Sequence, residues 1–261
     1  MGMQKLLSGI LRYRVTFKNE MVKQFQRIKD DPKPSAIVFT CMDSRMLPSR
    51  FCQAQIGDMF IVRNAGNLVP HYKHYGYEHI TTEPAALELG CVINNIKHVI
   101  VIGHSDCKAM NTLWSLKDEV ESQEGSPLQL WMKRHAKSSL KKFGPILGGK
   151  RGPLVFQAET PQHTFEAFID VENKFNITDK LSQVNCLQQV QNIASHPFLH
   201  EKLSSEQVRI HAMWFDIYTG EVYLFSRKNK KFIRIDEETI YKIFYRDRTI
   251  IDEVDLRDKD A

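Results

Sequence analysis

Two short clusters contain the side chains best suited to hold a metal ion. Cys41 opens the segment Cys-Met-Asp-Ser-Arg, and His104 and Cys107 lie in the segment Gly-His-Ser-Asp-Cys. Zinc prefers tetrahedral coordination by nitrogen and sulfur; its catalytic sites use three protein ligands, whereas its structural sites usually use four. No fourth Cys or His lies close to either cluster in the sequence. The pattern therefore indicates a Cys₂His set that leaves room for water or a substrate.

Asp43 and Arg45 lie just downstream of Cys41 and add an acid with its own counter-charge. The guanidinium of Arg45 can keep the carboxylate of Asp43 ionised and correctly oriented. Each of these residues also has an ordinary structural explanation, because a lone Cys often packs as a small apolar side chain and a His often packs in the core. Spacing alone supports the two interpretations equally.

Both clusters follow short apolar runs that must position them. Residues 36–40 and 99–102 are rich in β-branched side chains without helical spacing, which predicts buried strands of a sheet covered on both faces. In open α/β sheets, ligands bind in the crevice outside the carboxyl ends of the strands. Two neighbouring strands could therefore bring Cys41, His104 and Cys107 to one point at that edge.

The whole chain predicts an α/β fold in which helices flank a central, mostly parallel sheet. We divide it into an N-terminal helical arm, residues 1–35, and a single domain, residues 36–261, whose C-terminal extension is a hairpin followed by a helix. The pattern predicts a further strand at 58–62 and a hairpin of strands at 208–215 and 221–226. It predicts helices at 18–29, 83–94, 109–120, 128–143, 164–175, 181–194 and 237–245.

The bulk composition is that of a chain that can build a large core, and we expect neither a membrane nor a nucleic acid as partner. Hydrophobic residues make up 42% of the 261 residues, and the formal net charge is +5. No apolar stretch approaches the roughly 20 residues that span a bilayer. The basic tract at 227–231 is short and fits a solvated turn between strands better than a nucleic-acid surface. The five cysteines are scattered, which favours a reducing compartment.

Residues 1–19 combine basic side chains with an apolar helical face. Lys5, Arg12 and Arg14 precede the first acid, Glu20. The apolar residues at helical spacing are Leu6, Leu7, Ile10, Leu11 and Val15. This pattern suits a mitochondrial presequence, and it suits equally an amphipathic helix that packs on a partner subunit. We expect a mitochondrial protein, with a cytoplasmic location as the alternative.

The two clusters together resemble the signature of the β-class carbonic anhydrases, in their animal form. The pattern is Cys41-x-Asp43-Ser-Arg45, followed later by His104-x-x-Cys107. The similarity extends, in the same order along the chain, to the segments at 63–67, 83–89, 188–193 and 214–220. The resemblance implies one zinc ion per chain, held by Cys41, His104 and Cys107 at the C-terminal ends of the strands. It also implies a homodimer or a dimer of dimers.

The resemblance further implies the reversible hydration of carbon dioxide to bicarbonate and a proton by zinc-bound hydroxide. Asp43 would accept a hydrogen bond from that hydroxide, and Arg45 would keep Asp43 off the metal. Phe60 and Ala65 are candidates for the apolar wall of the substrate pocket, because carbon dioxide carries no charge. Two alternatives stay open: hydrolysis of carbonyl sulfide or carbon disulfide on the same scaffold, and a binding module with a purely structural zinc.

Overall fold

The computed structural model describes residues 2–74, 80–149, 152–158 and 163–246, so the tail at 247–261, which we assigned to the α/β domain, lies outside the described residues. The strands are β1 (Ala36–Cys41), β2 (Met59–Asn64), β3 (His98–His104), β4 (Leu154–Phe156), β5 (Phe165–Ala167), β6 (Arg209–Phe215), β7 (Val222–Ser226) and β8 (Lys231–Arg234). The α-helices are α1 (Gly2–Thr16), α2 (Lys18–Ile28), α3 (Pro48–Phe51), α4 (Thr82–Leu87), α5 (Lys108–Ser115), α6 (Pro127–His135), α7 (Lys137–Leu147), α8 (Ile177–Ala194), α9 (His200–Ser204) and α10 (Thr239–Arg246). Shorter turns are the 3-10 helices η1 (Tyr72–His74) and η5 (Pro197–Leu199) and the π-helix η3 (Glu88–Ile93).

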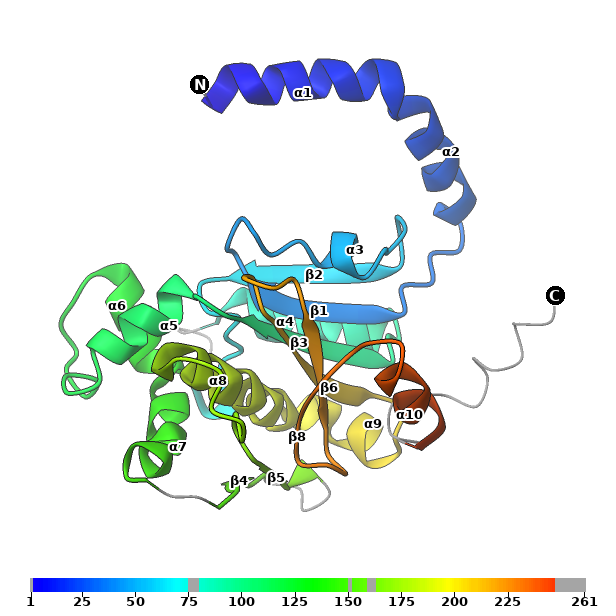
Figure 1. Ribbon diagram of the computed structural model, residues 1–261. Helices are drawn as coiled ribbons and strands as arrows, with labels where there is room; N and C mark the ends of the chain where they lie inside the picture. The colour runs from blue at the N-terminus through cyan, green and yellow to red at the C-terminus, as the bar shows by residue number, and fades with distance from the viewer. Residues whose placement is uncertain (1, 75–79, 150–151, 159–162, 247–261) are drawn as a thin grey trace.

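A central sheet organises the chain (Figure 1). Within the described residues it has six strands in the order β2-β1-β3-β6-β7-β8. The pairs β2–β1, β1–β3 and β3–β6 are parallel, whereas β7 and β8 are added antiparallel. Every residue of β1 is buried, as expected for a strand covered on both faces. The prediction of an α/β fold with a central, mostly parallel sheet is confirmed.

One face of the sheet is covered by α8 together with η3. Cys186 of α8 lies against Gly103 of β3, and Gly90 of η3 lies against Ile37 of β1. Ile37 pairs with Val99, and side chains alternate along a strand, so Ile37 and Gly103 belong to the same face. Nearly the whole length of α8 is buried, which makes this helix the main support of β3 and β6.

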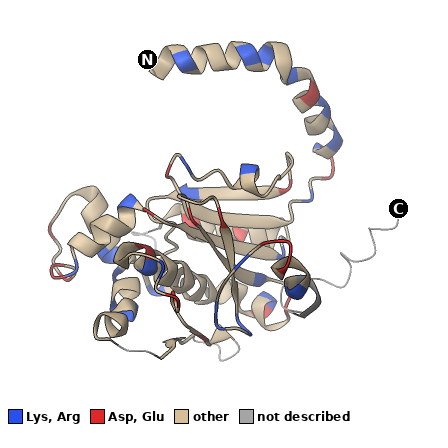
Figure 2. Ribbon diagram, viewed as in Figure 1, with Lys and Arg blue, Asp and Glu red and all other residues tan. Residues whose placement is uncertain are grey.

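Part of the opposite face is covered by the short helix α3. There Phe51 stacks on Phe215, the last residue of β6, with ring centroids 4.9 Å apart. The helices α1 and α2 bury no residue and extend from the domain as an arc beyond β2 (Figure 1). Lys and Arg are spread along this arm (Figure 2). Among the described residues, no helix combines the length and apolar character needed to cross a membrane.

Two of the predicted helices take a different form. The prediction of a helix at 164–175 is wrong, because Phe165–Ala167 forms β5, which pairs with β4 in a separate antiparallel sheet. Phe165 pairs with Phe156 in that ladder, and the two buried rings stack with centroids 5.0 Å apart, a contact between segments that no local pattern indicates. The predicted helix at 128–143 is two helices, α6 and α7, which meet at Ala136.

The basic tract at 227–231 connects β7 to β8, whose ladder closes with Ser226 opposite Lys231. Its expected place in a turn between strands is therefore confirmed. The sequence pattern did not predict β8, because a four-residue strand at the edge of a sheet has little apolar periodicity. The predicted hairpin of β6 and β7 is present.

Gly103 gives the first prediction, because its position tests the contact between β3 and α8. An added Cβ would lie 3.2 Å from both Cys186 Cβ and Trp214 Cδ1. We expect Gly103→Ala to destabilise the protein by about 1–3 kcal/mol through overpacking. The control is Gly148→Ala, whose Cβ would meet nothing closer than 3.6 Å and should change stability by less than about 0.5 kcal/mol. Urea unfolding at one fixed protein concentration measures both, and equal effects would contradict the proposed packing.

Candidate metal centre

The predicted ligands meet at the carboxyl edge of the sheet. Cys41 is the last residue of β1 and His104 is the last residue of β3, and these strands are parallel neighbours. Cys107 immediately precedes α5. The candidate ligand atoms of the three residues all lie within 4.8 Å of one another, and all three residues are buried. The structure therefore brings together the Cys₂His set that the sequence indicates.

The spacing of the two sulfur atoms fits a single zinc ion. Cys41 Sγ and Cys107 Sγ are 3.9 Å apart. Two thiolates that each lie about 2.3 Å from one tetrahedral ion are about 3.8 Å apart. The group comprises three residues within the described chain, which is the number typical of a catalytic zinc site rather than a structural one.

The imidazole of His104 is oriented for ligation. Its Nδ1–H donates to the carbonyl oxygen of Ser105 at 2.7 Å, because a carbonyl can only accept. This bond leaves the lone pair on Nε2, and within the described residues Nε2 is a buried atom without a hydrogen-bond partner. A buried nitrogen without a partner costs free energy, whereas a second hydrogen bond that fixes the tautomer is typical of a metal-bound histidine. A metal ion would satisfy this atom.

The two thiols are electrostatically coupled. The pKa of Cys41 is lowered, chiefly because Cys107 donates a hydrogen bond to its sulfur. The pKa of Cys107 is raised by the same hydrogen bond and by burial. One thiolate therefore forms readily, and a second buried negative charge beside it requires a cation.

Asp43 and Arg45 form the predicted pair, and the structure shows that it is bidentate. Arg45 Nε donates to Asp43 Oδ1 at 3.0 Å, and Arg45 Nη2 donates to Asp43 Oδ2 at 2.8 Å. The backbone N–H of Arg45 also donates to Oδ1 at 2.9 Å. These hydrogen bonds hold the pKa of Asp43 well below its usual range. Asp43 is therefore a carboxylate at any pH near neutrality, and it is not part of the three-residue group of possible ligands.

Asp106 and Arg63 complete this corner of the site, and the sequence reasoning did not assign them roles. Arg45 Nη1 donates to Asp106 Oδ2 at 2.8 Å, so Arg45 is held between two carboxylates. Arg63 Nη2 donates to the carbonyl oxygen of Asp43 at 2.6 Å and so fixes the turn after β1. Asp106 lies between His104 and Cys107 in the chain, so its position could have indicated that it belongs to the site. No sequence neighbour of Arg63 indicates that it contacts the segment after β1.

Side chains of α8 fix the segment that follows β2. Asn185 Nδ2 donates to the carbonyl oxygen of Gly66 at 3.0 Å. Gln189 Oε1 accepts from the backbone N–H of Val69 at 2.8 Å, and Asn192 Nδ2 donates to the carbonyl oxygen of Val69 at 2.9 Å. Because Asn64 at the end of β2 pairs with Cys41, these amides fix the segment that lies beside the sulfur. They explain why a buried helix carries so many polar side chains.

The structure places the two predicted pocket residues differently. Ala65 directly follows β2, whose last residue pairs with Cys41, and its carbonyl oxygen accepts a hydrogen bond from Trp131 Nε1 at 2.9 Å. Phe60 pairs with Ile37 near the start of β1, roughly 13 Å along the strands from Cys41. Ala65 is thus at the level of the metal ligands and Phe60 is not. The role of both residues in binding substrate stays a prediction.

Comparison with known proteins identifies the family. The family model for carbonic anhydrases matches residues 36–222. Beta carbonic anhydrase 1 of Caenorhabditis elegans is 49% identical over 245 residues, which cover 91% of this chain and 90% of the relative. The chain belongs to the β-carbonic anhydrase family. Beta carbonic anhydrase 1 of Caenorhabditis briggsae is 46% identical with the same coverage. The resemblance seen in the two clusters is confirmed, and the protein is a carbonic anhydrase.

Solved β-carbonic anhydrase structures share the fold. The structure of the β-carbonic anhydrase CcaA has a TM-score of 0.71 at 24% identity, covering 90% of this chain and 92% of that one. A structure from work on two tetrameric β-carbonic anhydrases of Sordaria macrospora has a TM-score of 0.64 at 17% identity, covering 85% and 96%. At these identities the likeness establishes the arrangement of sheet and helices.

The metal centre gives the second prediction. Cys107→Ala removes one of three ligands, so we expect zinc affinity to fall by more than the roughly 10- to 100-fold that loss of an outer partner costs. The control is Cys91→Ala, which also removes a buried thiol; burial raises the pKa of Cys91 to about 12, so that side chain stays neutral. Zinc content after dialysis against a chelator measures the difference. Equal zinc retention by the two variants would exclude Cys107 as a ligand.

Proposed function

We propose that this chain hydrates carbon dioxide reversibly to bicarbonate and a proton with one zinc ion, held by Cys41, His104 and Cys107. The single observation that carries the proposal is the buried Nε2 atom of His104 in a chain of this family. This atom lies within 4.8 Å of two thiols and has no hydrogen-bond partner among the residues that the structure describes. Zinc in such a site supplies a Lewis acid that makes a nucleophile from water near neutral pH.

Asp43 has the free acceptor needed to orient the reacting water. Oδ1 already accepts two hydrogen bonds from Arg45, whereas Oδ2 accepts one. A carboxylate oxygen offers two lone pairs, so Oδ2 can accept one more proton donor. Arg45 is held in turn by Asp106, and Arg63 holds the backbone of Asp43. Asp43 therefore acts as a fixed acceptor that sets the direction of attack on carbon dioxide.

The named relatives and the ligand number favour hydration over the two alternatives. The relatives are carbonic anhydrases, which supports carbon dioxide over carbonyl sulfide or carbon disulfide as the substrate. Three ligands from the described residues support a catalytic zinc over a purely structural one. Stopped-flow hydration of carbon dioxide by zinc-loaded protein, repeated after chelation, tests the metal and the reaction together; activity that survives full removal of zinc would contradict the proposal.

The third prediction concerns the pair of Asp43 and Arg45. Arg45→Gln removes the largest cause of the low pKa of Asp43, so this pKa should rise towards or above its ordinary value of 3.8. A carboxylate with a higher pKa becomes protonated earlier as pH falls, so on the acid limb kcat/KM should fall more steeply for the variant than for the wild type as the pH approaches the ordinary carboxyl value of 3.8. We also expect kcat/KM at pH 7 to fall by about 10- to 100-fold, because the carboxylate loses its orientation.

The matched control for this prediction is Arg50→Gln in α3, which removes an exposed arginine outside the hydrogen bonds described for Asp43. Zinc content must be equal in the wild type and both variants, so that only the carboxylate differs. An Arg45→Gln enzyme with unchanged kcat/KM and an unchanged acid limb would remove the proposed role of Asp43.

We also propose that two copies assemble through their N-terminal arms. The apolar residues of α1 are exposed, with Leu6 at 64% and Ile10 at 54% of full exposure, and no residue of α1 or α2 is buried within one chain. An amphipathic helix with an uncovered apolar face needs a surface to pack on. The β-carbonic anhydrases of Sordaria macrospora are described as tetrameric, which supports self-association of this chain. In a symmetric dimer, each copy would present the same arm to the other.

The fourth prediction tests this arm. Ile10→Asp places a charge on the apolar face of α1, so we expect the dimer dissociation constant to rise by at least about tenfold. The control is Thr16→Asp, which introduces the same charge at least about 80° around the helix from each residue of the apolar face and should leave the constant unchanged. Analytical ultracentrifugation measures both. If the two variants dissociate equally, the apolar face of α1 is not the contact.

We propose a mitochondrial location, which the composition of residues 1–19 supports through Lys5, Arg12 and Arg14 before the first acid. Import with cleavage of a presequence would remove α1, whereas assembly through the arms requires α1 to be retained. The intact mass of the protein from fractionated cells distinguishes them. Full-length protein confined to the cytoplasm would contradict the mitochondrial proposal and leave α1 available for assembly.

A further inference from the structure

The hydrogen bond that fixes the tautomer of His104 ends on a peptide group whose other end is also held. The Ser105 carbonyl oxygen accepts from His104 Nδ1–H at 2.7 Å. The same peptide group continues into Asp106, whose backbone N–H donates to Asp179 Oδ1 at 2.7 Å. The carboxylate of Asp179 is therefore connected to the imidazole of His104 through one peptide group and two short hydrogen bonds.

This peptide group lies in the turn that follows β3. Asp106 has a φ of +52°, in the left-handed region that is unfavourable for a residue with a side chain. On the other side of the peptide group, the backbone N–H of Ser105 donates to the carbonyl oxygen of Phe215 at 3.0 Å. A turn that is unfavourable by itself persists only when its surroundings hold it, and the hydrogen bond from Asp106 to Asp179 is one such contact.

Asp179 lies in the first turn of α8 and is buried, with 3% of its surface exposed. Its Oδ2 accepts from Asn176 Nδ2 at 2.7 Å, and its backbone N–H donates to Asn176 Oδ1, the N-cap of the helix, at 2.9 Å. Both carboxylate oxygens thus accept hydrogen bonds, as expected for the ionised form. Burial opposes this charge and raises the pKa of Asp179, whereas the hydrogen bond from the Asp106 N–H lowers it.

A negative charge at the N–H end of a peptide group strengthens its carbonyl oxygen as an acceptor, because hydrogen bonds in a chain polarise one another. The Ser105 carbonyl oxygen then accepts the proton of His104 Nδ1 more strongly. An imidazole that donates a stronger bond from Nδ1 is a stronger base at Nε2, which is the effect of the carboxylates that contact many metal-bound histidines. In this chain the carboxylate acts through a peptide group instead of directly.

We propose that Asp179 is a positioning residue for the metal ligand His104: through the Ser105–Asp106 peptide group it orients the imidazole and strengthens Nε2 as a ligand. This inference rests on the proposed zinc site, and it assigns a role there to a residue outside the two sequence clusters. A residue that only stabilised the start of α8 would make the same hydrogen bonds to Asn176 without affecting the metal.

Two variants of the full chain separate these roles. Asp179→Asn leaves an oxygen that can accept from the Asp106 N–H, but it turns an NH₂ group towards the NH₂ group of Asn176. The double variant Asn176→Asp with Asp179→Asn restores that hydrogen bond with donor and acceptor exchanged, and Asp is also a favourable N-cap residue. The double variant therefore keeps the total charge and the helix start, and it moves the charge away from the Asp106 N–H.

We expect Asp179→Asn to weaken zinc binding by at least about tenfold and the double variant to weaken it by at least about fivefold, measured by competition with a chelator. The Nδ1–H proton resonance of His104, measured by NMR on zinc-loaded protein with ¹⁵N-labelled histidine, should move upfield in both, because the bond to Ser105 weakens. If Asp179→Asn fails to fold, the double variant carries the test. A smaller loss of affinity in the double variant, or an unmoved resonance, would overturn the proposal and leave Asp179 as a capping residue.

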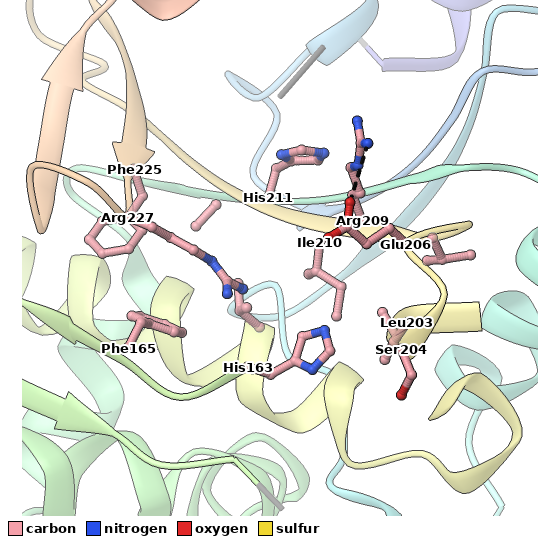
Figure 3. Close-up of a pocket in the computed structure, with 13 residues that line it drawn as sticks. His163, Phe165, Leu203, Ser204, Glu206, Arg209, Ile210, His211, Phe225 and Arg227 are labelled. Atoms are coloured by element: carbon pink, nitrogen blue, oxygen red, sulfur yellow. Dashed lines mark ion pairs between the residues drawn. The ribbon is translucent and has the colours of Figure 1, made fainter. Parts of the chain in front are cut away.

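Two controls test whether loss of any carboxylate has the same effect. Asp170→Asn removes another buried carboxylate, whose oxygens accept from two backbone N–H groups. Glu206→Gln removes an exposed carboxylate that pairs with Arg209 beside a cavity of about 550 Å³, which β6 lines roughly 20 Å along the strands from His104 (Figure 3). Both controls should keep the zinc affinity and the resonance of the wild type. A loss in either control equal to that of Asp179→Asn would overturn the proposal.

The wild-type protein separates failure of this inference from failure of the proposed function. Wild-type protein without zinc-dependent hydration of carbon dioxide would overturn the proposed function and this inference together. Wild-type protein that binds zinc and hydrates carbon dioxide, with equal zinc affinity in the double variant, would overturn the role of Asp179 alone.

Discussion

The parallel pairing of β1 with β3 is the constraint on which the metal centre depends. Neither cluster can bind a metal strongly alone, because each contributes only one or two of the three side chains. Pairing from Ala36 with His98 to Thr40 with Ile102 brings both strand ends to one edge of the sheet. A shift of this register by one residue would turn Cys41 to the opposite face of the sheet. Burial of β1 on both faces makes such a shift costly.

Charge compensation is the second organising feature of the site. Two buried thiols and the carboxylate of Asp43 lie close together, and each negative charge requires a partner at short range. Arg45 supplies that partner for Asp43, and it is itself shared with Asp106. The two thiols still need a cation to balance their charge, and the imidazole Nε2 of His104 would be a neutral ligand for it. The hydrogen bonds between Asp43 and Arg45 thus leave one acceptor position on Asp43 Oδ2 for a further donor.

The helix α8 links the metal edge of the sheet to its opposite end. Near its start, Ser182 donates a hydrogen bond to the carbonyl oxygen of His104 at 2.7 Å. In its middle, Asn185 and Gln189 hold the segment after β2, and Val190 lines the cavity beside β6. One buried helix therefore supports both regions through different faces. The polar side chains of α8 can be buried along most of its length because they form these hydrogen bonds.

The sequence alone predicted the Cys₂His group and the pair of Asp43 and Arg45, because apolar runs that end in polar clusters are local signals, and the family resemblance decided between a metal site and simple packing. The same local signals predicted the sheet class. Only the tertiary structure decided that residues 165–167 form a strand, that Phe60 lies away from the ligands, and that Arg63 fixes the turn after β1. It alone placed Asp179 of α8 beside the turn that follows β3. These outcomes depend on strand register and on contacts between residues far apart in the chain, which leave no periodic signal in a single sequence.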